Sequence, residues 1–166
     1  DPRADLEAAV GHYDAALRQV PDFGYAHANR GLALTELADY EREHGLPPQA
    51  HLDDAEATLR KAVQLMPDLD GTHSRLAEAY ATRAEYQLAI GEDPAPALAR
   101  AQERLDETIR INPKPGPDVW MLRGRVALIE DAAGEKPGAG RRRRFFLAER
   151  RGGNWVRGSG SRITGV

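Results

Sequence analysis

Histidine is the residue type in this sequence best suited to chemistry, because a neutral imidazole binds metal ions and exchanges protons near neutral pH. Of the five histidines, His44 and His51 lie within one short segment, "EHGLPPQAHL", with Glu43 and Asp53 beside them. Imidazole and carboxylate groups of this kind are ligands of zinc. The similar segment "LAIGEDPAPAL" contains no histidine. We therefore expect a solvated turn here and no metal site.

Two further histidines, His27 and His73, are separated by 73 − 27 = 46 residues. The same interval separates many other residues along the chain, so these two histidines occupy one position of a repeated pattern. A position that recurs with the repeat is explained by packing between repeats. We therefore expect a structural role for His27 and His73 in place of a ligand role.

Motifs for catalysis do not stand out. The chain has no cysteine, which excludes thiolate nucleophiles and cysteine metal sites. It has no His-Glu-x-x-His, no Gly-x-Ser-x-Gly and no phosphate-binding Gly-x4-Gly-Lys-Ser/Thr, and the run "RGSGSR" is not followed by a lysine. The acidic clusters at 53–56 and 103–107 are expected to be solvated. We predict no catalytic residue, no cofactor and no enzymatic activity.

The composition favours helices. Hydrophobic residues make up 41% of the 166 residues but aromatic residues only 6%, and Ala, Leu, Glu and Arg, which lose little side-chain freedom in a helix, are plentiful. No apolar run reaches the roughly 20 residues that span a bilayer. We therefore expect an all-α, cytoplasmic protein without a membrane span. Because the chain begins without methionine, we expect it to be a piece of a longer protein.

The repeat is marked by Pro21, Pro67 and Pro113, which are spaced by 67 − 21 = 46 and 113 − 67 = 46 residues. Before each proline, small and large residues alternate at helical spacing, which predicts a packing face between helices. In three successive copies these are Ala9, Tyr13 and Ala16, then Ala55, Leu59 and Ala62, then Ala101, Leu105 and Thr108. After each proline a small residue recurs as Gly31, Ala77 and Gly124, where a paired helix can approach closely.

These signals predict helices over residues 2–20, 25–43, 48–66, 72–90, 94–111 and 117–132. Gly45 and Gly91 suit helix C-caps, and Pro48 and Pro94 suit the first turn of the next helix. The predicted organisation is a half repeat at 1–21, complete repeats at 22–67 and 68–113, and a partial repeat at 114–140. A basic tail rich in Gly and Arg follows at 141–166, for which we expect a short helix near 140–151 and then poor order.

The repeat resembles the tetratricopeptide repeat (TPR), whose signature residues are matched here by His73, Leu76, Ala77, Tyr80, Ala101, Leu105, Thr108 and Pro113. Arg30 and Arg123 replace the leucine in the other copies. The resemblance implies a right-handed superhelical solenoid of antiparallel helix hairpins, here with about 46 residues per repeat. The unit with "GEDPAPALARAQERLDETIRINP" also looks similar to the repeat regions that follow bacterial eukaryotic-like Ser/Thr protein kinases. That resemblance implies a regulatory or docking region of such a kinase.

Solenoids of this kind bind partners on the concave face of each first helix. We expect a scaffold that holds a peptide or helix of a partner protein there. The chaperone-binding members of the family carry a clamp for a C-terminal carboxylate, of which only Arg75 is present, so we do not predict such binding. Leu122 and Leu128 are equally explained as the packing surface for a following helix. The predicted partner-binding residues are Tyr25, Asn29, Leu32, Ser74, Arg75, Glu78, Thr82, Met121 and Arg125.

The basic tail offers an alternative function. Residues 141–166 contain eight Arg and one Glu, so they carry +7, and the first 140 residues carry −3 − 7 = −10. Arg141, Arg142, Arg143 and Arg144 stand next to two phenylalanines, a pattern that can bind phosphates and stack bases or contact an anionic membrane surface. Two other interpretations stay open, namely a linker to a further segment and an altered reading frame.

Overall fold

A computed structural model of the chain describes residues 2–134, and within this part every regular element is an α-helix. All six predicted helices are confirmed, with ends within two residues of the expected positions. Their bounds are α1 Pro2–Gln19, α2 Gly24–Glu43, α3 Gln49–Leu65, α4 Asp70–Ile90, α5 Ala95–Ile111 and α6 Pro117–Gly134. The predicted basic tail with Arg141–Arg144, and the helix expected near 140–151, lie outside the described residues.

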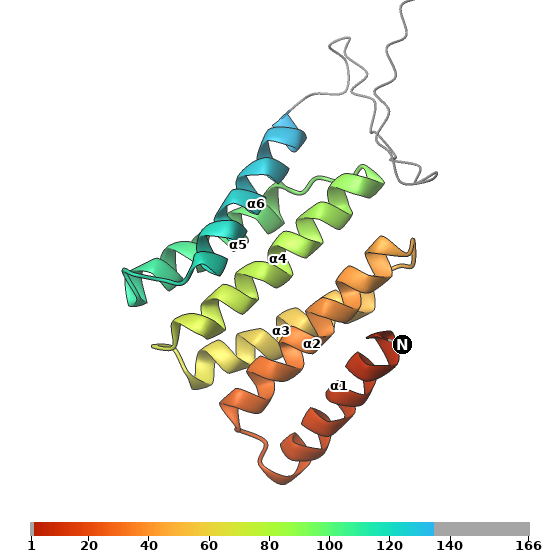
Figure 1. Cartoon of the computed structure of the whole chain (residues 1–166), viewed down its shortest axis with the longest axis vertical. Coiled ribbons are helices and arrows are strands. Elements are labelled where there is room, and N and C mark those ends of the chain that lie inside the picture. The colour runs from red at the N-terminus through yellow and green to blue at the C-terminus, as the bar shows by residue number, and fades with distance from the viewer. Residues whose placement is uncertain (1, 135–166) are drawn as a thin grey trace, which may run out of the picture. The chain divides into compact units, whose positions relative to one another are not determined.

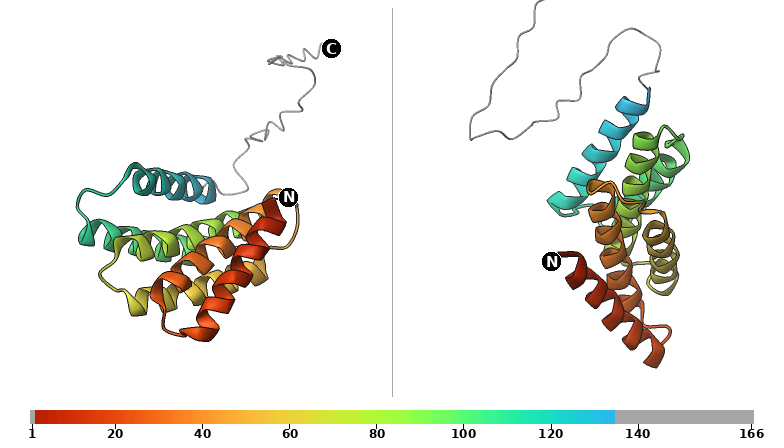
Figure 2. Two further views of the ribbon diagram at one scale, coloured as in Figure 1. Left: turned by 60° about the horizontal axis from the view of Figure 1, so that its bottom comes forward. Right: turned by 90° about the vertical axis from the view of Figure 1, so that its right-hand side faces the viewer.

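Consecutive helices pack side by side as antiparallel hairpins (Figure 1). In addition, α2 packs against α4, and α4 packs against α6, so the even-numbered helices form one layer. Figure 2 shows the same helices in two turned views. The odd-numbered helices contact only the helices next to them in sequence. The closer association of α2, α4 and α6 makes one side of the described part a continuous surface of three helices.

The turns between paired helices use the residues that the sequence predicts. Gly45 and Gly91 have φ values of 69° and 79°, a left-handed conformation that costs a residue with a side chain about 1 kcal/mol or more. Gly91 is the C-cap of α4. Pro48 and Pro94 directly precede α3 and α5, and their carbonyls accept the backbone hydrogen bonds of Leu52 and Leu98. The two hairpins therefore turn in the same way.

The predicted packing face is confirmed in α3 and α5. Ala55 and Ala101 are completely buried, as is Leu59, and Leu105 is nearly so. In α1, which packs only against α2, the equivalent Ala9, Tyr13 and Ala16 are only partly buried. Burial at this position therefore depends on having a helix on both sides.

The small residue of each even-numbered helix shows the same dependence. A methyl group added at Gly31 of α2 would lie 2.4 Å from Cγ of the buried Leu59 in α3. Gly124 occupies the corresponding position of α6, and a methyl group there would meet no atom of the described residues within 4 Å. Gly31 is therefore required by close helix packing, whereas no neighbour within residues 2–134 restricts the side chain at position 124.

None of the helices in the part that the structure describes has the length and apolar character needed to cross a lipid bilayer.

This contrast predicts opposite effects for one substitution at two equivalent positions. Gly31→Ala should lower the free energy of unfolding by about 1–2 kcal/mol, because overpacking against Leu59 outweighs the gain in helix propensity. Gly124→Ala should raise it by up to about 1 kcal/mol, because only the propensity gain operates. Urea denaturation followed by circular dichroism measures both. Equal effects of the two substitutions would show that the assigned register is wrong.

Candidate partner-binding face

The predicted partner-binding residues come from the three helices of one layer. We call the surface formed by α2, α4 and α6 the even-helix face, and it comprises Tyr25, Asn29, Leu32, Glu36, Ser74, Arg75, Glu78, Met121, Leu122 and Arg125. Tyr25 and Met121 are 58% and 75% exposed, and most other members are partly buried. The predicted residue Thr82 is fully buried, so it lies beneath this surface and is not accessible to a partner.

The first link across the even-helix face joins two of the predicted residues. Nη1 of Arg75 in α4 donates a hydrogen bond to Oδ1 of Asn29 in α2 at 2.8 Å. The two residues occupy the same repeat position, because 75 − 29 = 46. A position expected to contact a partner is thus also used to hold neighbouring repeats together.

The second link is a charged network between all three helices. Arg125 of α6 contacts both carboxylate oxygens of Glu85 in α4, at 2.7 and 2.8 Å, and lies 3.5 Å from Asp39 of α2. Its Nη2 also donates to Oγ1 of Thr82 at 3.2 Å, and the Thr82 hydroxyl donates to Asp39. Arg42 adds an ion pair to Glu85 at 3.4 Å. Arg125 therefore connects α6 to both α4 and α2 through polar contacts.

Sequence reasoning missed the acidic members of this network. Asp39 and Glu85 also differ by 85 − 39 = 46 residues, so their recurrence was a signal that could have found them. They sit about one turn beyond the residues that the repeat pattern places on the face. Their partners come from different helices, and the sequence spacing alone does not pair them.

Three carboxylates on or beside the even-helix face have no cation in direct contact among the described residues. Glu36 of α2, Glu78 of α4 and Asp118 of α6 form no hydrogen bond or ion pair with the residues described here. Burial raises the pKa of Glu78 above its ordinary value, and the charges of Asp39 and Glu36 add to this effect, while Arg125 and Arg75 oppose it. The carboxylate of Glu78 is therefore held at a cost in stability at neutral pH.

For Glu85 the arginine contacts together have a larger effect on the pKa than burial has. Burial alone would raise the pKa of its carboxyl group, but the hydrogen bonds and charge of Arg125, together with the charge of Arg42, outweigh burial and lower the pKa. The pKa values of these two glutamates, which lie seven positions apart on α4, are therefore shifted in opposite directions. Glu85 has an arginine in hydrogen-bond contact, and Glu78 does not.

A small cavity of about 80 Å³ lies between α4 and α6 beside the unpaired carboxylates. Two of its lining residues, Glu78 and Asp118, are acidic, and none is basic. The other three are Ser74, Val119 and Leu122. Two larger hollows lie elsewhere, one between α5 and α6 and one where α3, α4 and α5 meet.

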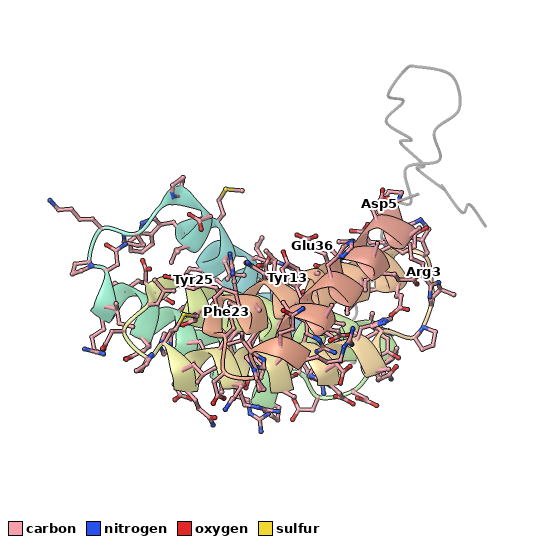
Figure 3. The ribbon with its side chains drawn as sticks, turned by 90° about the horizontal axis from the view of Figure 1, so that it is seen from below. Arg3, Asp5, Tyr13, Phe23, Tyr25 and Glu36 are labelled. Atoms are coloured by element: carbon pink, nitrogen blue, oxygen red, sulfur yellow. The ribbon has the colours of Figure 1, made fainter. Side chains whose placement is uncertain are left out.

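Aromatic side chains are exposed at the start of α2. The rings of Phe23 and Tyr25 meet edge to face with centroids 6.4 Å apart, and both are about half exposed. Figure 3 shows this pair side by side at the start of α2, with Glu36 farther along the same helix. Exposed aromatic groups of this kind commonly anchor a bound partner.

The exposed apolar residues of α6 have a different explanation. Leu128 is 73% exposed, yet the equivalent Thr35 and Ala81 are buried in α2 and α4. Met121 corresponds to the buried Ala28 in the same way. Leu122 is partly buried against the core. Leu128 and Met121 thus stand where the earlier repeats receive a following helix.

Four of the five histidines have structural partners. Nε2 of His27 and of His73 lies 2.8 and 2.9 Å from the carbonyl oxygens of Pro21 and Pro67, so each histidine ties its helix to the preceding turn. Nδ1 of His44 lies 2.7 Å from the carbonyl oxygen of Tyr40, and His51 contacts the buried Glu41. Among the described residues, no group of His, Cys, Asp and Glu is arranged to hold a metal ion.

One acidic cluster differs from the prediction. Glu56 was expected to be solvated but is buried, and it forms a short ion pair with Arg83 of α4. The same arginine contacts Asp53 at 2.6 Å. The long arginine side chain reaches over from the neighbouring helix, which sequence spacing does not show.

No protein-family model and no curated protein matches this sequence.

The two glutamates of α4 give a matched test of the network. Glu85→Gln should lower the free energy of unfolding at neutral pH by about 0.5–1 kcal/mol, because it removes a partly exposed charge pair. Glu78→Gln should raise it, because a buried charge without a bonded partner is removed.

The pH dependence has the corresponding signs. The lowered pKa of Glu85 means that its stabilising effect is present above the ordinary glutamate pKa and is lost as pH falls through the lowered value. The raised pKa of Glu78 means that its destabilising effect disappears as pH falls through the raised value. Thermal melts of both variants between neutral and acidic pH measure this, and changes of the same sign at neutral pH would contradict the assignment.

Proposed function

We propose that this chain is a helical-repeat interaction module, similar to TPR proteins, that holds a segment of a partner protein against the even-helix face. The observation that carries the proposal is the direct packing of α2 on α4 and of α4 on α6, which produces one surface from three repeats. Continued with the same hand as in TPR proteins, this stack would form a right-handed superhelix with the even-helix face on its concave side.

The even-helix face has the properties of a preorganised binding surface. The Arg75–Asn29 hydrogen bond and the Arg125–Glu85 ion pair connect its helices before any partner arrives. A platform that is already ordered loses little conformational entropy on binding. The exposed side chain of Tyr25 on α2 supplies apolar contact area. A mixed surface of this type suits a peptide or an amphipathic helix.

The similarity to repeat regions that follow bacterial Ser/Thr protein kinases extends this proposal. In that setting the module would bring a substrate or a regulator close to a kinase domain. Its own contribution would be binding alone. The proposal requires only that the partner segment be accessible in extended or helical form.

Selection from a displayed library of random peptides tests the binding face. Peptides that bind the full chain should lose affinity by about tenfold with Tyr25→Ala or Leu32→Ala, because each substitution removes apolar contact on the face. Leu46→Ala is the matched control, because Leu46 is exposed in the turn between α2 and α3. Fluorescence anisotropy measures the affinities. Selected peptides that are equally sensitive to all three substitutions would place binding elsewhere.

A second candidate function rests on the composition of residues 141–166, with eight Arg and one Glu. Such a segment would bind phosphates of nucleic acid or an anionic surface by releasing counterions. We expect affinity for single-stranded oligonucleotides to fall steeply with salt and to be lost on deleting 141–166. Electrophoretic mobility shifts at several salt concentrations measure this. Undiminished binding after the deletion would eliminate the candidate.

A further inference from the structure

The charge of the even-helix side is unbalanced. Its carboxylates outnumber its guanidinium groups, giving 3 − 5 = −2. The four charged members of the even-helix face, Glu36, Glu78, Arg75 and Arg125, balance one another. The even-helix side adds the charged residues that lie beside the face, namely Asp39, Glu85 and Arg42 of the network and Asp118 of the cavity, and these give the excess of two carboxylates. A partner that carries positive charge would therefore be attracted to this side.

The three arginines are already engaged within the protein. Arg125 and Arg42 contact Glu85 and Asp39, and Arg75 donates to Asn29. An acidic partner would have to compete with these contacts. The negative charge that is available to a partner thus exceeds the positive charge.

Two of the unpaired carboxylates also line a hollow in the surface. Glu78 and Asp118 line the cavity between α4 and α6, and its other walls include Val119 and Leu122. The hollow is open to solvent on one side, and its volume of about 80 Å³ exceeds the roughly 10–15 Å³ that a single water needs on the same measure. That space accepts an ammonium group and the methylene groups next to it. Apolar walls with carboxylates at the same site match the two parts of a lysine side chain.

We infer that the partner segment held by the even-helix face is cationic, and that a lysine or arginine side chain of it enters the α4–α6 cavity to meet the carboxylates of Glu78 and Asp118. Glu36 on the neighbouring α2 pairs with a second basic residue of the same segment. This inference rests on the proposed function and specifies the chemistry of the partner.

The energetic reasoning favours this occupant over a neutral one. Glu78 is partly buried without a bonded counter-charge, so a cation at the cavity removes an existing electrostatic cost as well as adding attraction. A neutral segment would cover the same carboxylates and leave them desolvated. The face therefore discriminates against neutral partners by penalising them.

The test uses the full chain and two short fluorescein-labelled peptides of equal length. Both carry leucine and alanine at the same positions, and the remaining positions are all lysine in one peptide and all glutamine in the other. The lysine peptide should bind at least about tenfold more tightly by fluorescence anisotropy, and raising the salt concentration should reduce this difference.

Charge-neutralising variants locate the interaction. The double substitution Glu36→Gln with Glu78→Gln should lower the affinity for the lysine peptide by about tenfold. The affinity for the glutamine peptide should change by less than about twofold. The double substitution Glu92→Gln with Asp68→Asn is the matched control, because it also removes two negative charges, from the exposed turns between α4 and α5 and between α3 and α4. Circular dichroism confirms that each variant is folded.

Several outcomes would overturn the inference. They are equal binding of the two peptides, no binding of the lysine peptide, and an equal loss of affinity with the double substitution Glu92→Gln and Asp68→Asn, which would indicate diffuse attraction to an acidic protein. The proposed function is judged separately. If peptides selected from the random library bind the even-helix face but are not enriched in lysine or arginine, the interaction module stands and the cationic partner does not.

Discussion

Close approach between helices at a few small residues is the constraint on which the described structure depends. Gly31 leaves room for Leu59, and Ala55 and Ala101 are completely buried between helices. A larger side chain at such a position forces the paired helices apart. Since every later repeat is placed by the one before it, the local spacing of one hairpin determines where the next even-numbered helix lies. The surface formed by α2, α4 and α6 is a result of that spacing.

The sequence predicted the elements well for physical reasons. Helix periodicity, the prolines and Gly45 and Gly91 are local signals, and they recur at a fixed interval, so each copy supports the others. The positions of Ala55 and Ala101 on a buried face followed from the same periodicity. The superhelix hand and the family stay predictions, as do the function and the partner.

Side-chain partnerships were much harder to predict. Arg83 contacts Glu56, and Arg125 contacts Glu85, although the members of these pairs are 27 and 40 positions apart in the sequence and lie on different helices. Arginine is long and flexible, so knowing which face it starts from does not tell which acid it meets. For this reason Thr82 was assigned to the accessible face, although its hydroxyl lies beneath the network that Arg125 completes.

The low burial of α1 and α6, the first and last helices of the described part, affects local stability. No residue of α1 is buried, and α6 buries only Val119, Val126 and Ile129. In a stack whose helices contact only near neighbours, a helix that buries few residues can open while the others stay folded. Amide hydrogens of α6 should therefore exchange with solvent by partial opening while α3 and α4 remain intact. A ligand that touches both α4 and α6 would suppress this fraying, which couples recognition to the folding equilibrium of the last helix.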